Sequence, residues 1–176
     1  APLPQGARGE KSASNEACEE RRIVNVHRSF LPSQKQEPPN GVKVAILSML
    51  FNWPSTGGGI IHTVELAQFL GRAGFDVRHF YAKYPEWGAG KVDAATPFPS
   101  EPLEFDAATW NVATIQQRFR HAVDAFDPDY VIITDSWNFK PLLAEAVRGY
   151  PYFLRLQAME CICPLNNVRL LPEGGG

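Results

Sequence analysis

The chain has 176 residues, of which 44% are hydrophobic and 20% charged, and its formal net charge is −2 at pH 7. This length suffices for one domain with a sizeable core. The nearly balanced charge gives no electrostatic reason to expect binding to nucleic acid or to an anionic membrane surface. No apolar run approaches the roughly 20 residues of a transmembrane segment, and the polar residues 1–10 are unlike a secretory signal. We expect a cytoplasmic protein, with peripheral association with a membrane left open.

The cysteine content argues against a disulfide framework, because only Cys18, Cys161 and Cys163 are present. Cys161-Ile162-Cys163 could form half of a thiolate metal site completed further along a longer chain, but no histidine follows it. Two reduced cysteines are the favoured interpretation, and no metal site is expected. The chain lacks an initiator methionine and ends in three glycines, so we expect it to be a piece of a longer protein.

The first 40 residues are polar and rich in proline, which predicts a mostly flexible leader. Within it, residues 23–27 could add a short edge strand. From Gly41 the pattern changes to that of a folded domain, assigned to residues 41–176. A nearly continuous apolar run over 42–50 predicts a strand buried on both faces.

A loop is expected over residues 51–59, followed by a helix whose apolar face runs from Ile60 to Ala73 and which Gly74 ends. Residues 82–101 read as a long loop. The remaining elements are strands at 76–81, 103–105, 130–134 and 152–156 and helices at 112–126 and 141–147.

Apolar strands that alternate with helices predict an α/β fold, with a doubly wound, mainly parallel, Rossmann-like sheet and helices on both faces. In such sheets ligands bind beyond the carboxyl ends of the strands. That rule selects three segments as candidate binding sites: 52–59, 135–138 and 157–160.

Three consecutive glycines, Gly57, Gly58 and Gly59, precede the first helix. They either let backbone N–H groups approach an anion at the helix N-terminus or form a plain tight turn. The dinucleotide and Walker fingerprints are both missing, which disfavours hydride transfer and ATP hydrolysis. His62 is expected in the first helical turn, where the positive helix end disfavours an imidazolium; the alternative is a surface histidine.

Polar residues after the later strands supply the other candidates. Asp135 is placed to bind sugar hydroxyls and Trp137 to stack on a ring, although the same segment could cap the next helix. Gln157 and Glu160 follow the last strand, where Glu160 is either a base or solvated surface. Asp127-Pro128-Asp129 matches an Asp-x-Asp metal signature, but it precedes a strand, so a helix-to-strand turn is preferred.

These motifs together resemble the amino-terminal half of family 4 glycosyltransferases of the GT-B fold, over roughly residues 42–160. The resemblance rests on the strand Val44-Ala45-Ile46-Leu47, the glycine triplet, the helix His-Thr-x-Glu-Leu-Ala-x-x-Leu from His62, and the strand that follows Pro128. The usual family form has two glycines and a Gly-His-x-Val element, for which this chain has Gly74-Phe75-Asp76-Val77.

The resemblance implies an acceptor-side domain that faces a second Rossmann-like domain across a cleft. That second domain, with its Glu-x7-Glu motif, would bind the nucleotide-sugar and is missing from this chain, so the fragment should be catalytically silent. Gly57, Gly58, Gly59 and His62 would lie near the donor phosphates. The acceptor-side candidates are Asn52, Trp53, Thr56, Asp135, Trp137, Asn138, Gln157 and Glu160.

The resemblance implies no metal and no cofactor beyond the nucleotide-sugar donor. Many family members carry a histidine after the strand that corresponds to 152–156, whereas this chain has Gln157 and Met159 there, so no catalytic residue is assigned. Two alternatives stay open: a non-catalytic sugar- or nucleotide-binding module of the same fold and, more weakly, a Rossmann-type oxidoreductase.

Overall fold

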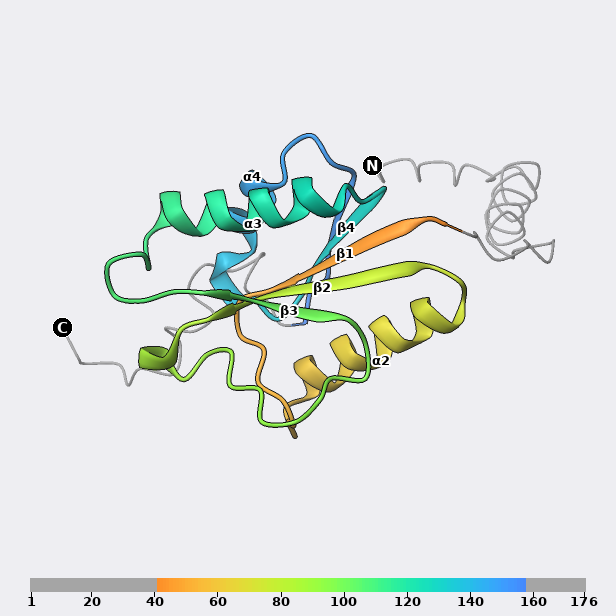
Figure 1. Ribbon diagram of the computed structural model, residues 1–176, viewed down its shortest axis with the longest axis horizontal. Helices are drawn as coiled ribbons and strands as arrows, with labels where there is room; N and C mark the ends of the chain where they lie inside the picture. The colour runs from red at the N-terminus through yellow and green to blue at the C-terminus, as the bar shows by residue number, and fades with distance from the viewer. Residues whose placement is uncertain (1–40, 158–176) are drawn as a thin grey trace, which may run out of the picture. The chain divides into compact units, whose positions relative to one another are not determined.

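A parallel β-sheet forms the centre of the domain in the computed structural model, which describes residues 41–157 apart from the side chain of Trp137. All neighbouring strands pair in parallel, in the order β3-β2-β1-β4-β5. The strands are β1 (Lys43–Ser48), β2 (Asp76–Lys83), β3 (Ser100–Glu104), β4 (Tyr130–Ile133) and β5 (Tyr152–Leu154) (Figure 1). The predicted α/β, doubly wound fold is therefore confirmed.

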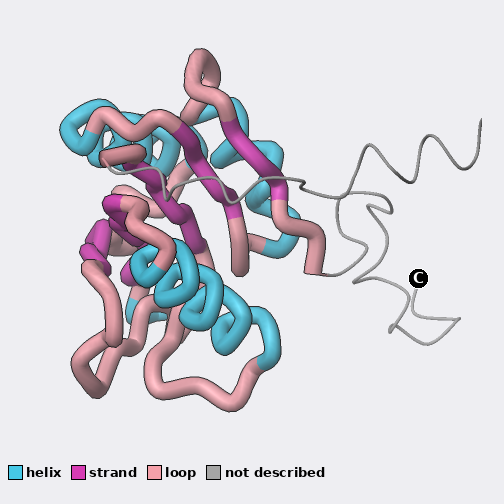
Figure 2. The backbone as a smooth tube through the Cα atoms, turned by 90° about the vertical axis from the view of Figure 1, so that its right-hand side faces the viewer, coloured by secondary structure: helices cyan, strands magenta, loops and turns pink. Residues whose placement is uncertain are grey.

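Helices cover both faces of this sheet (Figure 2). Helix α2 (Gly58–Arg72) lies on one face, and α3 (Val112–Phe126) and α4 (Lys140–Ala146) lie on the other (Figure 1). The chain runs outward from β1 to β3 and then returns to β4 on the other side of β1. The carboxyl ends of β1 and β4 therefore form the switch point at which doubly wound sheets usually bind ligands.

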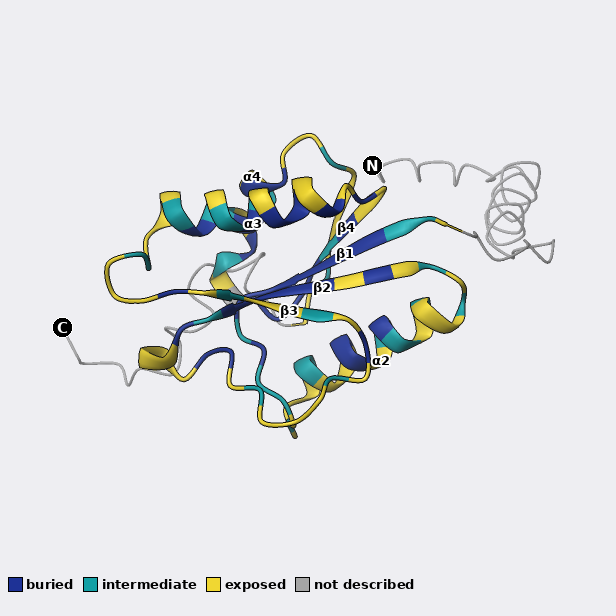
Figure 3. Ribbon diagram, viewed as in Figure 1, coloured by how far each residue is buried: buried dark blue, intermediate teal, exposed yellow. Residues whose placement is uncertain are grey.

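Alternating residues of the strands fill two separate cores. The buried residues lie on the central strands and on the helices that cover them (Figure 3). Leu47 and Phe80 point toward Phe119 of α3 in one core, while Ile46 points toward Val64 of α2 in the other. This alternation explains why β1 appears in the sequence as one continuous apolar run.

The first helix begins earlier than the sequence pattern predicts. Gly57 is its N-cap, with φ −72° and ψ 124°, and Gly58 and Gly59 already belong to the first turn. His62 consequently lies in the second turn, so its predicted place in the first turn is wrong. The predicted end of this helix is confirmed, because Gly74 follows it with a left-handed φ of 93°.

The segment predicted as one long loop over 82–101 contains regular structure. Strand β2 extends to Lys83, the 3-10 turn η1 covers Pro85–Trp87, and β3 begins at Ser100. Single β-bridges join Trp53 to Val92 and Tyr84 to Ala89. The segment is thereby tied to the loop that follows β1.

Asp127-Pro128-Asp129 forms the turn from α3 into β4, at the amino end of the sheet. Asp127 caps the helix with a left-handed φ of 52°, and the Asp129 carboxylate accepts a 2.8 Å hydrogen bond from the backbone N–H of Lys43. These contacts agree with the interpretation as a turn rather than a metal site.

Within residues 41–157, no helix has the length and apolar character needed to cross a membrane. The predictions for residues 23–27, Cys18, Glu160, Cys161 and Cys163 lie outside the described residues.

Candidate functional site

The N-terminus of α2 opens at the carboxyl end of β1 without a side-chain cap. The backbone N–H of Gly57 donates to Ser55 Oγ at 3.0 Å, and the helical ladder starts with Ile61 N–H donating to the Gly57 carbonyl at 3.1 Å. A Cβ built on Gly58 would meet nothing within 4 Å. Gly58 therefore offers an open approach to a helix end that favours anions.

Gly59 faces inward and meets two other predicted residues. A Cβ at Gly59 would lie 2.5 Å from Asp135 Oδ1 and 3.0 Å from Gln157 Oε1. The Gln157 side-chain amide also donates to the Gly59 carbonyl at 3.2 Å. Three segments that are distant in the sequence thus converge on the first turn of α2.

The Asp135 carboxylate lies beneath this turn, and the residue is only 6% exposed. The hydroxyl of Thr63 donates to its Oδ2 atom, and Thr134 Oγ1 lies 3.4 Å from the same oxygen. Burial raises the pKa of Asp135, while hydrogen bonds from Thr63, Gln157 and Thr134 and the positive charge of Arg155 oppose that rise. Asp135 is therefore not the open sugar-binding carboxylate that its sequence position predicts.

A buried polar row, which no sequence pattern predicted, extends from this carboxylate across the sheet. Ser48, Thr63, His79 and Thr134 each have 0% exposure. His79 lies between hydroxyl groups on neighbouring strands, and its burial lowers its pKa to about 3. The sequence carries only a weak indication of this row, namely one polar residue in an otherwise apolar run, such as Ser48 in β1.

Two of the predicted acceptor-binding residues, Asn52 and Trp53, instead hold the loop after β2 in place. The Asn52 amide donates to the Gly88 carbonyl at 2.9 Å and accepts from the Lys91 N–H at 2.8 Å. The Trp53 indole N–H donates to the Ala95 carbonyl at 3.2 Å. Their polar atoms are thus engaged by the protein, which argues against the predicted acceptor contacts.

The other candidates are dispersed around the same edge. Thr56 and Asn138 are exposed, and Trp137 begins the 3-10 turn η2 (Trp137–Phe139). His62 is exposed, and its Nδ1 atom lies 3.7 Å from a carboxylate oxygen of Glu65. This pairing turns His62 toward its own helix surface.

An aromatic cluster, also not predicted from the sequence, is formed by residues that follow β2, β3 and β4. Tyr84 and Trp110 stack with ring centroids 4.5 Å apart, and Trp87 meets Trp110 edge-on at 5.3 Å and Phe139 at 6.0 Å. Trp87 is nevertheless 58% exposed. The cluster therefore presents an apolar ring near the carboxyl edge of the sheet.

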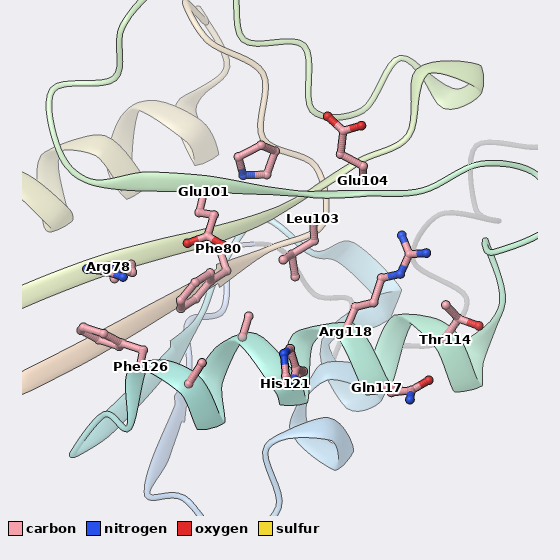
Figure 4. A pocket seen from close by; sticks show the side chains of 13 residues that line it. Arg78, Phe80, Glu101, Leu103, Glu104, Thr114, Gln117, Arg118, His121 and Phe126 are labelled. Atoms are coloured by element: carbon pink, nitrogen blue, oxygen red, sulfur yellow. The ribbon is translucent and has the colours of Figure 1, made fainter.

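A separate groove of about 710 Å³ runs between α3 and the outer strands β2 and β3 (Figure 4). Phe80 and Leu103 line it from the sheet, and Arg118 and His121 line it from α3. None of the candidate site residues that the sequence suggested lines this groove. In residues 41–157 no group of three or more His, Cys, Asp or Glu side chains is placed to hold a metal ion.

The fold and this edge define a Rossmann-like α/β domain with a glycine-lined helix N-terminus at its switch point. No family model matches the chain, and no curated protein matches it. Among solved structures, the C-terminal domain of PF1911 hydrogenase from Pyrococcus furiosus is similar at 14% identity and a TM-score of 0.42. That match covers 71% of this chain and 100% of the other, and it is too weak to indicate a function.

Proposed function

We propose that this chain contains the acceptor-side domain of a GT-B glycosyltransferase similar to family 4, which transfers a sugar from a nucleotide-sugar to an acceptor. The supporting observation is the uncapped N-terminus of α2, which opens beside the carboxyl end of β1 with free space at Gly58. A helix end of this kind supplies backbone donors and a partial positive charge for a phosphate.

In this proposal the N–H groups of the first turn of α2 approach the diphosphate of the donor. They stabilise the negative charge that develops on the leaving phosphate, because fixed dipoles need no reorganisation during the reaction. Asp135 supports the turn from below, where its carboxylate is buried and accepts a hydrogen bond from Thr63. In this proposal a second Rossmann-like domain would hold the nucleotide.

The acceptor would lie along the same edge of the sheet. Trp87 offers an exposed ring on which a sugar ring can stack. Thr56 and Asn138 offer exposed polar groups. Asn52 and Trp53 are assigned to the support of the loop that carries Trp87, because their side chains bind the segment that follows it.

Release of nucleotide from a panel of nucleotide-sugars by the complete native protein tests the proposal. We expect release from at least one donor, and loss of at least tenfold in kcat/KM in Gly58→Val. Gly71→Val is the matched control, since it places the same side chain in the last turns of α2 where a Cβ also meets nothing within 4 Å. Release from none of the donors would refute the enzyme proposal, and full activity of Gly58→Val would refute the phosphate site.

A non-catalytic sugar- or nucleotide-binding module is the second candidate. It is favoured by the burial of Asp135, whose carboxylate is bound to protein groups rather than open to a substrate. Saturable binding of a nucleotide or a sugar to the native protein, without turnover of any donor, would support this second function over the first.

A further inference from the structure

A continuous row of hydrogen-bonding side chains crosses four adjacent strands and ends at α2. His79 Nδ1 lies 2.6 Å from Ser100 Oγ on β3, and His79 Nε2 lies 3.0 Å from Ser48 Oγ on β1. Ser48 Oγ is 3.0 Å from Thr134 Oγ1, which follows β4. Thr134 in turn is 3.0 Å from Thr63 Oγ1 of α2.

This row has Asp135 at one end and solvent near the other. The Thr63 hydroxyl donates to Asp135 Oδ2, whereas Ser100 is partly exposed. The four positions between these ends, Thr63, Thr134, Ser48 and His79, are fully buried. Within residues 41–157 these four side chains form hydrogen bonds only with one another, with Asp135 and with Ser100, so the protons of the row are shared among its members.

Counting protons fixes the direction of each bond when Asp135 is ionised. A carboxylate only accepts, and each hydroxyl has one proton to donate. The protons of Thr63 and Thr134 are both directed to the carboxylate, so Thr134 accepts from Ser48. Ser48 then accepts from His79, whose Nε2 carries the proton while Nδ1 accepts from Ser100.

Protonation of Asp135 reverses the direction of the hydrogen bonds along the row. The carboxyl group then donates to Thr63, and Thr63 donates to Thr134, in the direction its geometry allows. Thr134 donates to Ser48, and Ser48 donates to Nε2 of His79. The ring then carries its proton on Nδ1 and donates to Ser100.

We propose that Ser100, His79, Ser48 and Thr134 form a directional proton wire to Asp135, in which the charge of Asp135 sets the tautomer of His79. Ser100 gives its proton to Nδ1, and Nε2 gives its proton to Ser48. The proton of Ser48 passes to Thr134, and that of Thr134 passes directly to Asp135 Oδ2. Thr63 keeps its own proton, which turns from the carboxyl group to Thr134 Oγ1. Ser100 regains a proton from water, so the net change is one proton taken from solvent and bound to Asp135.

The surroundings of the wire allow the carboxyl group to titrate while the ring stays neutral. Asp135 faces Gln157 and the positive charge of Arg155. His79 is packed among aromatic rings, of which Tyr81, at a centroid distance of 5.5 Å, is titratable. Burial raises the pKa of Asp135 and of Tyr81 and lowers that of His79 to about 3. The wire gives Asp135 a proton route that avoids the outer face of α2, whether or not the chain transfers a sugar.

Nuclear magnetic resonance of the complete 176-residue chain tests this inference. The side-chain ¹⁵N shifts of His79 and the carboxyl ¹³C shift of Asp135 are followed from pH 8 to pH 4, with His79→Gln identifying the ring signals. We expect the protonated nitrogen to change from Nε2 to Nδ1 with the midpoint of the Asp135 titration. A ring that keeps one tautomer through that titration would overturn the proposal.

A substitution that interrupts the row of hydrogen bonds provides a second test. In Thr134→Val, Asp135 should still titrate while the tautomer of His79 no longer follows it. Thr114→Val is the matched control, because Thr114 lies in the first turn of α3, outside the row, and should preserve the coupling. Coupling that survives in Thr134→Val would refute the wire; if that variant does not fold, the titration of the wild-type chain decides alone.

Discussion

Gly59 and Asp135 approach each other so closely that a Cβ on Gly59 would lie 2.5 Å from Asp135 Oδ1. Its neighbour Gly58 has no atom within 4 Å of the corresponding position. The two glycines therefore have different roles in the same helical turn. Gly59 makes room for a buried carboxylate, whereas Gly58 leaves the helix end open on the outside.

Gly59→Ala should destabilise the domain by about 1 to 3 kcal/mol, because the added methyl group must displace Asp135 or the helix start. Gly58→Ala, the matched control, should leave stability unchanged or raise it by up to about 1 kcal/mol, since alanine favours helix over glycine. Urea unfolding of both variants checks this. Equal stabilities of the two variants would contradict the different roles of the two glycines.

The fold was largely predictable from local patterns. The apolar run Val44–Leu47 indicated a strand covered on both faces, and the alternation of strands and helices indicated the parallel sheet. The start of α2 was not predictable, because glycine propensity places Gly58 and Gly59 in a loop. In the structure the backbone of Gly59 lies against Asp135 and Gln157, which are distant in the sequence, so no local pattern reports these contacts.

The site was predictable only where one rule applied, namely that ligands bind beyond the carboxyl ends of parallel strands. That rule selected Gly59, Asp135 and Gln157, which the structure brings together. It could not select His79, because the partners of a buried histidine depend on strand order and register. His79 pairs directly with Ser100 only because β3 lies beside β2 in this register.

The buried ring of His79 should make stability fall in mild acid. Because its folded pKa, about 3, lies below the ordinary value of 6.5, its contribution is fully present above pH 6.5 and is lost as the pH falls toward 3. Linkage gives a loss of about 2 kcal/mol between pH 7 and pH 5. Urea unfolding at the two pH values should show this loss in the wild-type chain.

His79→Gln is the matched variant for that measurement, since it removes the titrating ring and keeps a polar side chain. Its stability should be lower at pH 7 and should change less between pH 7 and pH 5. The other three histidines are present in both proteins, so their effects cancel. An identical pH dependence in the two proteins would contradict a neutral, buried His79.

Asp135 should have the opposite dependence on pH. Burial raises its folded pKa above the ordinary value of 3.8, so its stabilising effect is complete below pH 3.8 and is lost as the pH rises through the folded value. The free energy of unfolding of the wild-type chain, relative to that of Asp135→Asn, should therefore decrease with rising pH. An increase would show that hydrogen bonds to the carboxylate outweigh its desolvation.

Asn52 should control the stability of the loop that follows β2. Asn52→Ala removes the bonds to the Gly88 carbonyl and the Lys91 N–H, so hydrogen exchange at the Lys91 amide should accelerate by about tenfold, equivalent to about 1.4 kcal/mol. Asn138→Ala is the control, because Asn138 is exposed in η2 and should leave this exchange rate unchanged. Unaltered exchange in Asn52→Ala would mean that other contacts, such as the β-bridges that join Trp53 to Val92 and Tyr84 to Ala89, suffice to hold the loop that carries Trp87.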